Sequence, residues 1–265
     1  KYRVDFGRQN IAHPHTYPFA ERFGVLAAYL PGDEAFNEVG LSLSERAALH
    51  GDTSLEVAVD WLQGDSFRIE RESSGDSEDP LELGGDDRAG EARPAFNGRV
   101  AAFTLLGEQS GLEFGLSAAG GTNNVAAGTR TLVYGADAKA KLWTSPRAYL
   151  LLQGELLRLE RDDAGWDPAS AYTQSRSRAL GGYIYADYNW ATRYNAGVSY
   201  EAFEQPVTAT PIEQSMGAFA GLALLEETTS FRADWRRHLP DGADAFDEFT
   251  LRVVFSMGPH KAHQF

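Results

Sequence analysis

The sequence predicts an all-β protein, and more narrowly an antiparallel transmembrane β-barrel of about 12 strands, an even number as bacterial barrels prefer. Three observations predict this fold class. Many segments alternate between apolar and polar residues with a period of two. The connections between these segments alternate between short and long, which is typical of a barrel with tight turns on one rim and long loops on the other. The expected strands, at roughly 9–12 residues, are long enough to cross a bilayer.

The alternation places apolar residues on one face of each expected strand and polar residues on the other. In residues 134–142, Tyr134 shares a face with three alanines, while Asp137, Lys139 and Lys141 share the opposite face. The clearest segments are residues 55–61, 134–142, 194–202, 216–224, 231–235 and 249–257. Weaker candidates lie at 99–107, 111–119, 147–160 and 179–190, and the strand count starts from residues 1–8.

The connections fall into two groups, and we expect each group at one rim of a single domain spanning residues 1–265. Short periplasmic turns are expected near 49–52, 108–110, 144–146, 191–192 and 227–228. Longer connections are expected near 9–37, 64–98, 120–128, 162–178, 205–214 and 239–245. The stretches 9–37 and 64–98 would be extracellular or folded into the lumen, and the tail 258–265 would lie in the periplasm.

The polar faces of the expected strands predict a water-filled lumen. Burying many ionisable groups inside a small soluble barrel would be costly, whereas facing water costs little. The predicted pore-lining residues are Asp137, Lys139, Lys141, Gln153, Glu155, Asp187, Glu201, Arg232, Asp234 and Arg252. A soluble β-sandwich or a lipocalin-like barrel is the alternative, because aromatic residues near strand ends fit either a membrane interface or a soluble core.

Composition narrows the function classes. The formal net charge of −14 and the pI of 4.8 argue against nucleic acid as a partner. The absence of cysteine excludes disulfides, thiolate metal sites and cysteine nucleophiles. The abrupt start "KYRVDFG" leads us to expect a processed or truncated chain.

Enzyme motifs are missing from the sequence. It contains no G-x-S-x-G elbow, no P-loop and no H-E-x-x-H pair, so we expect no enzyme and no catalytic residue. His238, close in sequence to Asp241 and Asp244, is the one cluster that a barrel enzyme could use. No cofactor-binding motif stands out either.

Two segments resemble a known family. The stretch "FGRQNIAHPHTYPFAERF" and the ending "FSMGPHKAHQF" are similar to patterns in Gram-negative outer-membrane proteins labelled zinc-regulated or TonB-dependent outer-membrane receptors, which are porin-like. The matching positions are Phe6, Gly7, Arg8, Asn10, His13, His15, Pro18, Phe19, Arg22, Gly40, Ser42, Gly258, His260, His263 and Phe265. The resemblance implies the bacterial outer membrane, ion transport and a further N-terminal region. A chain of 265 residues is too short for a 22-stranded receptor with its plug.

Four histidines form two candidate metal sites. His13 and His15 flank a proline, and His260 and His263 stand near the C-terminus. In the expected topology the pairs lie about a membrane thickness apart, so one zinc ion cannot bridge them. Each pair could bind zinc with nearby carboxylates, which for the first pair are Glu21, Asp33 and Glu34. The alternative is that His13 and His15 pack the loop against the barrel wall and that the second pair belongs to an interfacial tail.

The leading functional prediction is a porin-like channel that passes small solutes. The acidic stretch at residues 65–91 would favour cations at its mouth, with zinc first among metal ions, although the same stretch fits a solvated external loop. The rival prediction is a non-transporting structural or docking barrel in an envelope protein complex. The expected partners are outer-membrane lipid, small solutes or cations and other envelope proteins.

Overall fold

One large antiparallel sheet dominates the computed structural model, which describes residues 1–13, 16–32, 35–69, 92–125, 127–167, 171–206, 211–225 and 229–255. Its 11 strands pair in chain order, each antiparallel to the next. They are β3 (Gly40–Ala48), β4 (Thr53–Leu62), β5 (Ala95–Leu106), β6 (Ser110–Asn124), β7 (Thr129–Ser145), β8 (Ala148–Asp167), β9 (Ala171–Trp190), β10 (Tyr194–Glu204), β11 (Ile212–Leu225), β12 (Thr229–Pro240) and β13 (Phe246–Phe255). The predicted all-β class is therefore confirmed.

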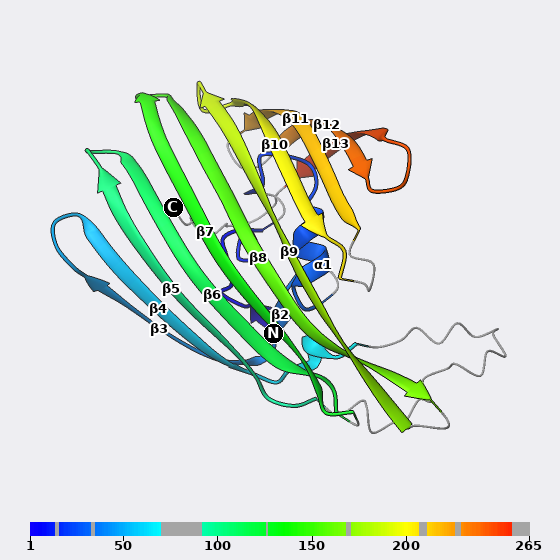
Figure 1. Cartoon of the computed structure of the whole chain (residues 1–265). Helices are drawn as coiled ribbons and strands as arrows, with labels where there is room; N and C mark the ends of the chain where they lie inside the picture. Colours follow the sequence, from blue (N-terminus) through cyan, green and yellow to red (C-terminus); the bar gives the residue numbers. More distant parts are fainter. Residues whose placement is uncertain are drawn as a thin grey trace.

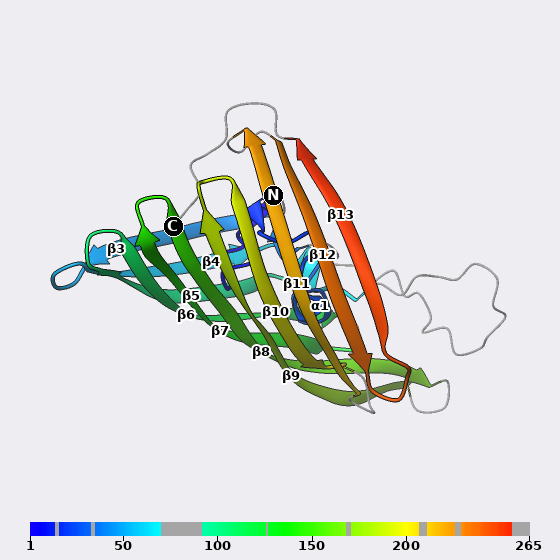
Figure 2. The ribbon, with the colours of Figure 1, turned by 90° about the horizontal axis from the view of Figure 1, so that it is seen from above.

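The sheet is strongly curved, and the chain before it lies on its concave side (Figures 1 and 2). We call residues 1–39 the inner segment. It contains the strand pair β1 (Tyr2–Arg3) and β2 (Asn37–Glu38) and the short helix α1 (Gly24–Tyr29). A 3-10 turn, η2 (Asp65–Phe67), follows β4. The sheet does not close on itself, because β3 and β13 are its two edges within the described part of the chain.

The large sheet has 11 strands, one fewer than the predicted count of about 12, because the first predicted strand is not part of it. Within residues 1–8, Tyr2–Arg3 is strand, and it pairs with β2 instead of joining the large sheet. The strand ends at Arg3, and the chain then turns, with the Phe6 N–H donating to the Val4 carbonyl at 2.8 Å and Gly7 in a left-handed conformation with φ of 63°. Val4 and Phe6 have no exposed surface, so this stretch belongs to the buried interior.

Two predicted long loops are also wrong. Strands β8 and β9 each run for 20 residues and pair as far as Asp167 and Ala171, through most of the expected loop 162–178. Strand β6 likewise continues to Asn124. Charged residues in this stretch pair across the strands, as Arg176 does with Asp162 at 2.7 Å between Nε and Oδ1.

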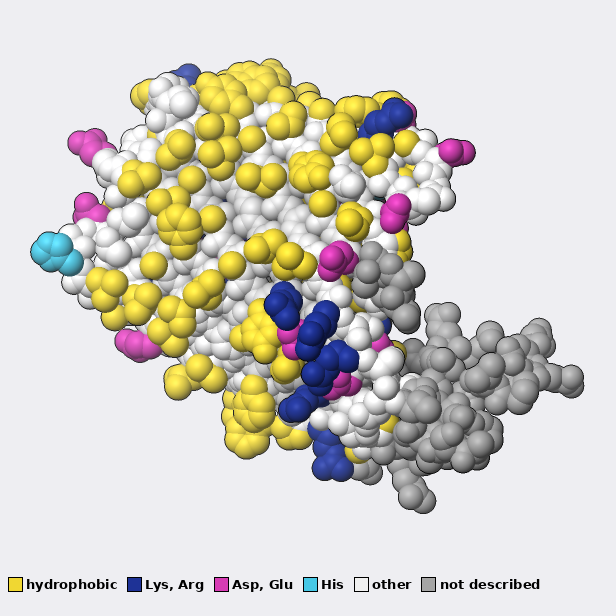
Figure 3. Space-filling view, in the orientation of Figure 1, with side chains coloured by type: hydrophobic (Ala, Val, Ile, Leu, Met, Phe, Trp, Pro, Cys, Tyr) yellow, Lys and Arg dark blue, Asp and Glu magenta, His cyan; other side chains and the backbone are white. Residues whose placement is uncertain are grey.

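The two faces of the sheet differ as the alternation predicts. The convex face exposes large apolar side chains from every strand, and Figure 3 shows many of them gathered over the strands. Examples are Leu43, Leu116, Val198 and Leu251, the last with 84% of its surface exposed. The concave face carries most of the buried polar side chains.

The hydrophobic core lies between the inner segment and the concave face. Phe6, Phe19, Phe23 and Leu26 from the inner segment pack in one buried cluster with residues of the sheet, including Tyr185. Among the described residues, no helix has the length and apolar character needed to span a membrane.

Candidate functional site: the inner segment docked on the concave face

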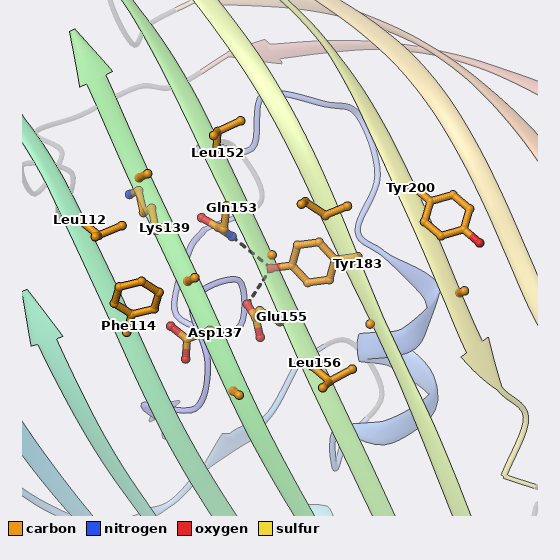
Figure 4. Close-up of a pocket in the computed structure, with 17 residues that line it drawn as sticks. Leu112, Phe114, Asp137, Lys139, Leu152, Gln153, Glu155, Leu156, Tyr183 and Tyr200 are labelled. Carbon is orange, nitrogen blue, oxygen red and sulfur yellow. Dashed lines mark hydrogen bonds between the residues drawn. The ribbon is translucent and has the colours of Figure 1, made fainter.

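The Phe6-Gly7-Arg8 stretch is anchored by a carboxylate of the sheet. Glu155 on β8 accepts hydrogen bonds at Oε1 from the backbone N–H of Arg8 at 2.9 Å and of Gln9 at 2.6 Å. The hydroxyl of Tyr183 on β9 donates to the same oxygen at 2.6 Å, and Gln153 donates to that hydroxyl (Figure 4). Hydrogen bonds to a charged acceptor are stronger than neutral ones, so Glu155 fixes this turn of the inner segment.

Glycine is required at position 7 for two reasons. Its φ of 63° is a backbone conformation that other residues adopt at a cost. A Cβ atom there would also lie 2.2 Å from Oε2 of Glu155. The absence of a side chain at Gly7 therefore lets the following backbone amides, of Arg8 and Gln9, reach the Glu155 carboxylate.

Arginines and carboxylates form a buried ionic cluster beside this turn. Arg99 on β5 contacts Asp137 on β7 through two nitrogens, with Nη1–Oδ2 at 2.5 Å and Nη2–Oδ1 at 2.9 Å. Its Nε lies 3.5 Å from Oδ1 of Asp5, and Arg8 pairs with Glu113 at 2.8 Å. Burial raises the pKa of the Asp5 carboxyl, and the Arg99 guanidinium opposes that rise. The cluster thus joins the inner segment to three strands.

Two further carboxylates anchor the second half of the inner segment. Asp234 on β12 accepts the backbone N–H of Ala20 at 2.7 Å, and Glu201 on β10 accepts that of Val25 at 2.9 Å. Between them, the ring of Phe19 packs edge-on against Tyr185 and Phe219 of the sheet. A series of sheet carboxylates therefore binds backbone amides along the whole inner segment.

Asn10 closes the inner segment on itself. Its Nδ2 donates to the carbonyl oxygens of Val4 at 2.8 Å and Phe36 at 3.1 Å, and its Oδ1 accepts the Phe36 N–H at 2.9 Å. One side chain thus ties the start of the segment to its end. Asn10, in the "FGRQN" stretch, therefore has a structural role in holding the inner segment together.

At the edge of the segment, Tyr2 reaches the sheet. Its hydroxyl donates to Oδ1 of Asp60 on β4 at 2.9 Å, and Asn97 donates to Oδ2 of the same carboxylate at 2.7 Å. Burial, together with the Asp60 carboxylate, raises the pKa of Tyr2 to about 12. Tyr2 therefore stays a neutral donor over the physiological range.

The predicted pore-lining residues come together on the concave side. Asp137, Gln153, Glu155, Asp187, Glu201 and Arg232 are buried, and Lys139, Lys141, Asp234 and Arg252 are partly buried. Glu155, Glu201 and Asp234 hold the inner segment itself, as described above. That the set lines a water-filled passage stays a prediction.

The predicted metal ligands are not brought together in the described structure. His13 is exposed, and its carbonyl oxygen accepts the N–H of Thr16 at 2.8 Å. His15, Asp33 and Glu34, as well as His260 and His263, lie outside the described residues. Within the described ranges, no group of three or more His, Asp or Glu side chains is arranged to hold a metal ion.

Several residues of the site were not predicted from the sequence. Asp60, Arg99 and Glu113 stand on the polar faces of strands and carry the same alternation signal as the predicted residues. Asn97 stands on the same face of β5 as Arg99 but falls in the expected loop 64–98, and Asp5 precedes the sheet, so neither was assigned to a polar face.

Comparisons with known proteins add one relative. No family model matches the chain. It is similar to an uncharacterized protein of Aquifex aeolicus (strain VF5), with 25% identity over 292 residues. The alignment covers 100% of this chain and 59% of that protein, so the chain spans less than two thirds of the relative's length. No solved structure matches.

Proposed function

We propose that the chain forms wall and interior of an outer-membrane β-barrel in a Gram-negative bacterium, a porin-like channel for small solutes. The observation that carries the proposal is the inverted character of the sheet. Its convex face exposes large apolar side chains along its length, whereas its concave face holds the buried charged ones. Exposed apolar surface of this extent marks contact with lipid or protein, and barrels alternate in this way between lipid and lumen.

Aromatic side chains support a membrane boundary at both ends of the strands. On the convex face Trp61 stacks on Phe96 near the rim of longer connections, with ring centroids 6.1 Å apart. At the opposite rim Trp190 stacks on Tyr188 and on Tyr194, at 6.0 and 5.8 Å. Such rings favour the interface between lipid and water.

The inner segment would act as the constriction of the channel. It is bound by buried carboxylates on the concave face, where a closed barrel would have its lumen. Closure of the wall would need further strands at β3 and β13, the two edges of the described sheet. The relative's greater length is consistent with a protein that contains more than this chain.

Cations are the solutes we favour. The net charge of −14 would raise the concentration of cations near the protein. The resemblance to zinc-related outer-membrane proteins makes zinc the first metal ion to test, with His13 as the described candidate ligand. A channel of this kind needs no catalytic group and no resident cofactor.

The test is ion current through the full-length protein in a planar bilayer, after folding is verified by a heat-dependent shift in gel migration. Wild-type protein should give stable, cation-selective steps. Glu155→Gln combined with Glu201→Gln should loosen the inner segment and enlarge the steps, whereas Glu108→Gln, in the exposed β5–β6 turn, should leave them unchanged. Zinc should reduce the wild-type current and do so less after His13→Ala. No steps from either folded protein would show that passage is the wrong function.

A structural or docking barrel is the second candidate. The specific observation in its favour is that the inner segment is hydrogen-bonded to the wall, on the face where six of the ten predicted pore-lining residues are buried. Free edges at β3 and β13 could also pair with a partner chain. A folded barrel without conductance, which retains a partner after mild cross-linking in cells, would fit this function.

A further inference from the structure

The convex face has a groove where its side chains are small. Its lining includes Ala136 and Ala138 on β7, Gly154 on β8 and Gly182 on β9. Phe114 and Tyr200 also line it (Figure 4). The groove is open to the outside and has a volume of about 660 Å³. We call it the small-residue groove.

Strand register leads from this groove directly to a group of arginines. Ala136 pairs with Leu156, which pairs with Gly182, and this row crosses the groove. The next convex row toward the rim of longer connections consists of Tyr134, Arg158 and Leu180. Tyr134 and Leu180 are still 44% and 50% exposed, so the apolar surface reaches the first arginine without a break.

Beyond that row the face becomes basic. The arginine cluster, by which we mean Arg130, Arg158, Arg176 and Arg178, lies on β7, β8 and β9, and Figure 3 shows the gathering of Lys and Arg side chains. Glu160 pairs with Arg158 at 2.7 Å and Asp162 pairs with Arg176 at 2.7 Å. A third carboxylate, Glu204 on β10, lies at the edge of the cluster, where it accepts the backbone N–H of Leu180 at 2.8 Å. The Arg158 and Arg176 side chains are still 54% and 52% exposed.

We propose that the small-residue groove and the arginine cluster together bind one lipid, a multiply acylated lipid with a phosphomonoester on its headgroup. An acyl chain would occupy the groove, and the phosphate would bind the arginines. The proposal rests on the proposed function, because it requires the convex face to contact a membrane.

Charge complementarity favours this occupant. With Glu204 counted beside Glu160 and Asp162, the four arginines still leave an excess of one positive charge, in a protein whose net charge is −14. A phosphomonoester carries roughly −1.5 to −2 charges at neutral pH, opposite in sign to that excess. Arginine also binds phosphate through paired N–H donors. A zwitterionic choline headgroup would bind more weakly, because its own cation would be repelled by the arginines.

The position of the arginine cluster along the strands indicates which leaflet of the membrane would supply the lipid. Charged side chains on the lipid-facing surface of a barrel are costly at mid-depth and are tolerated near the interfaces. The cluster lies toward the rim that carries the connection 63–94, and longer connections face the outside of the cell in outer-membrane barrels. The expected ligand is therefore the phosphorylated lipid of the outer leaflet.

The experiment measures retention of fluorescent lipid A, phosphatidylglycerol and phosphatidylcholine by the full-length protein in mixed detergent micelles. Lipid A should bind most tightly, and Arg130→Gln with Arg178→Gln should weaken it by about tenfold, since each charge-assisted bond contributes measurably. Glu160→Gln with Asp162→Asn should strengthen lipid A binding, because competing carboxylates are removed. Ala138→Leu should fill the groove and reduce binding, whereas Arg147→Gln, in the β7–β8 turn, should change nothing.

The outcomes separate this proposal from the proposed function. Equal lipid A affinity for the wild type and both cluster variants, in a protein that still shows heat-dependent migration, would overturn the lipid site and leave the barrel intact. Equal retention of phosphatidylglycerol and lipid A would overturn the phosphomonoester assignment. A protein that lacks heat-dependent migration and folds without detergent would overturn both proposals.

Discussion

The two faces of this sheet reverse the arrangement of an ordinary soluble protein. On the convex face the large apolar side chains are exposed, whereas on the concave face carboxylates such as Glu155 and Glu201 are buried. The side chains of each face match the groups that the face contacts. The concave face receives a polypeptide whose backbone N–H groups need acceptors, and the convex face offers no polar group for water over most of its area. Burial in this molecule therefore depends on contact with the inner segment and not on hydrophobicity alone.

A charge placed on the convex face should destabilise the protein far more than the same charge placed on the concave face. Leu251 and Thr250 are neighbours on β13 and point to opposite faces. If the convex face contacts lipid, Leu251→Arg should destabilise the folded barrel in vesicles by about 2–4 kcal/mol, while Thr250→Arg should have little effect. Urea titration of the vesicle-inserted full-length protein measures both. Equal stability of the two variants would argue that the convex face meets water or protein.

A smaller effect is expected when one acceptor of the concave face loses its charge. Glu155→Gln keeps the shape of the side chain but replaces an acceptor of two backbone N–H groups and the Tyr183 hydroxyl with a weaker one. We expect docking of the inner segment to weaken by about 1.5–3 kcal/mol. Hydrogen exchange at the Arg8 and Gln9 amides should accelerate accordingly. Glu108→Gln is the control of equal charge, and unchanged exchange in Glu155→Gln would mean that packing alone holds the segment.

The close approach of the backbone to Glu155 can be tested through glycine. Gly7→Ala should weaken docking by about 1–2 kcal/mol from its left-handed backbone, and further because its Cβ would meet Glu155. Gly51→Ala is a matched control, since Gly51 has φ of 58° and nothing within 4 Å of a built Cβ. The loss of global stability in Gly51→Ala measures the backbone cost alone, and a larger loss of docking in Gly7→Ala isolates the contact with Glu155. Identical behaviour would remove the steric argument for glycine at position 7.

Much of the sheet was predictable, while the inner segment was not. Alternation at residues such as Tyr134 and Val198 assigns strands and faces correctly, because the side-chain period of a strand is two. The charged ends of β8 and β9 were misread as a loop, because cross-strand pairs such as Arg176 with Asp162 are invisible in one sequence. Docking of the "FGRxN" stretch onto Glu155 joins residues 147 positions apart, and local patterns carry no signal for such a contact.

The smallest expected effect concerns pH and Tyr2. In an undocked segment this tyrosine would ionise near its ordinary pKa of about 10. The docked pKa is raised to about 12, so the stabilisation that Tyr2 gives to docking is complete below pH 10 and is lost as the pH rises toward 12. Tyr2→Phe lacks the hydroxyl that donates to Asp60, so docking should be weaker than wild type by about 1 kcal/mol at neutral pH.

The advantage of the wild type over Tyr2→Phe should therefore shrink between about pH 10 and pH 12, from the ordinary tyrosine pKa to the docked one. Because the chain contains no cysteine, Ala35→Cys, placed at a buried position of the inner segment, provides a reporter in both backgrounds. The rate at which this thiol is alkylated measures undocking, and comparison at each pH cancels the titration of the thiol itself. If the ratio of the alkylation rates of the two proteins stayed constant across that interval, the Tyr2 hydroxyl would not couple docking of the inner segment to pH.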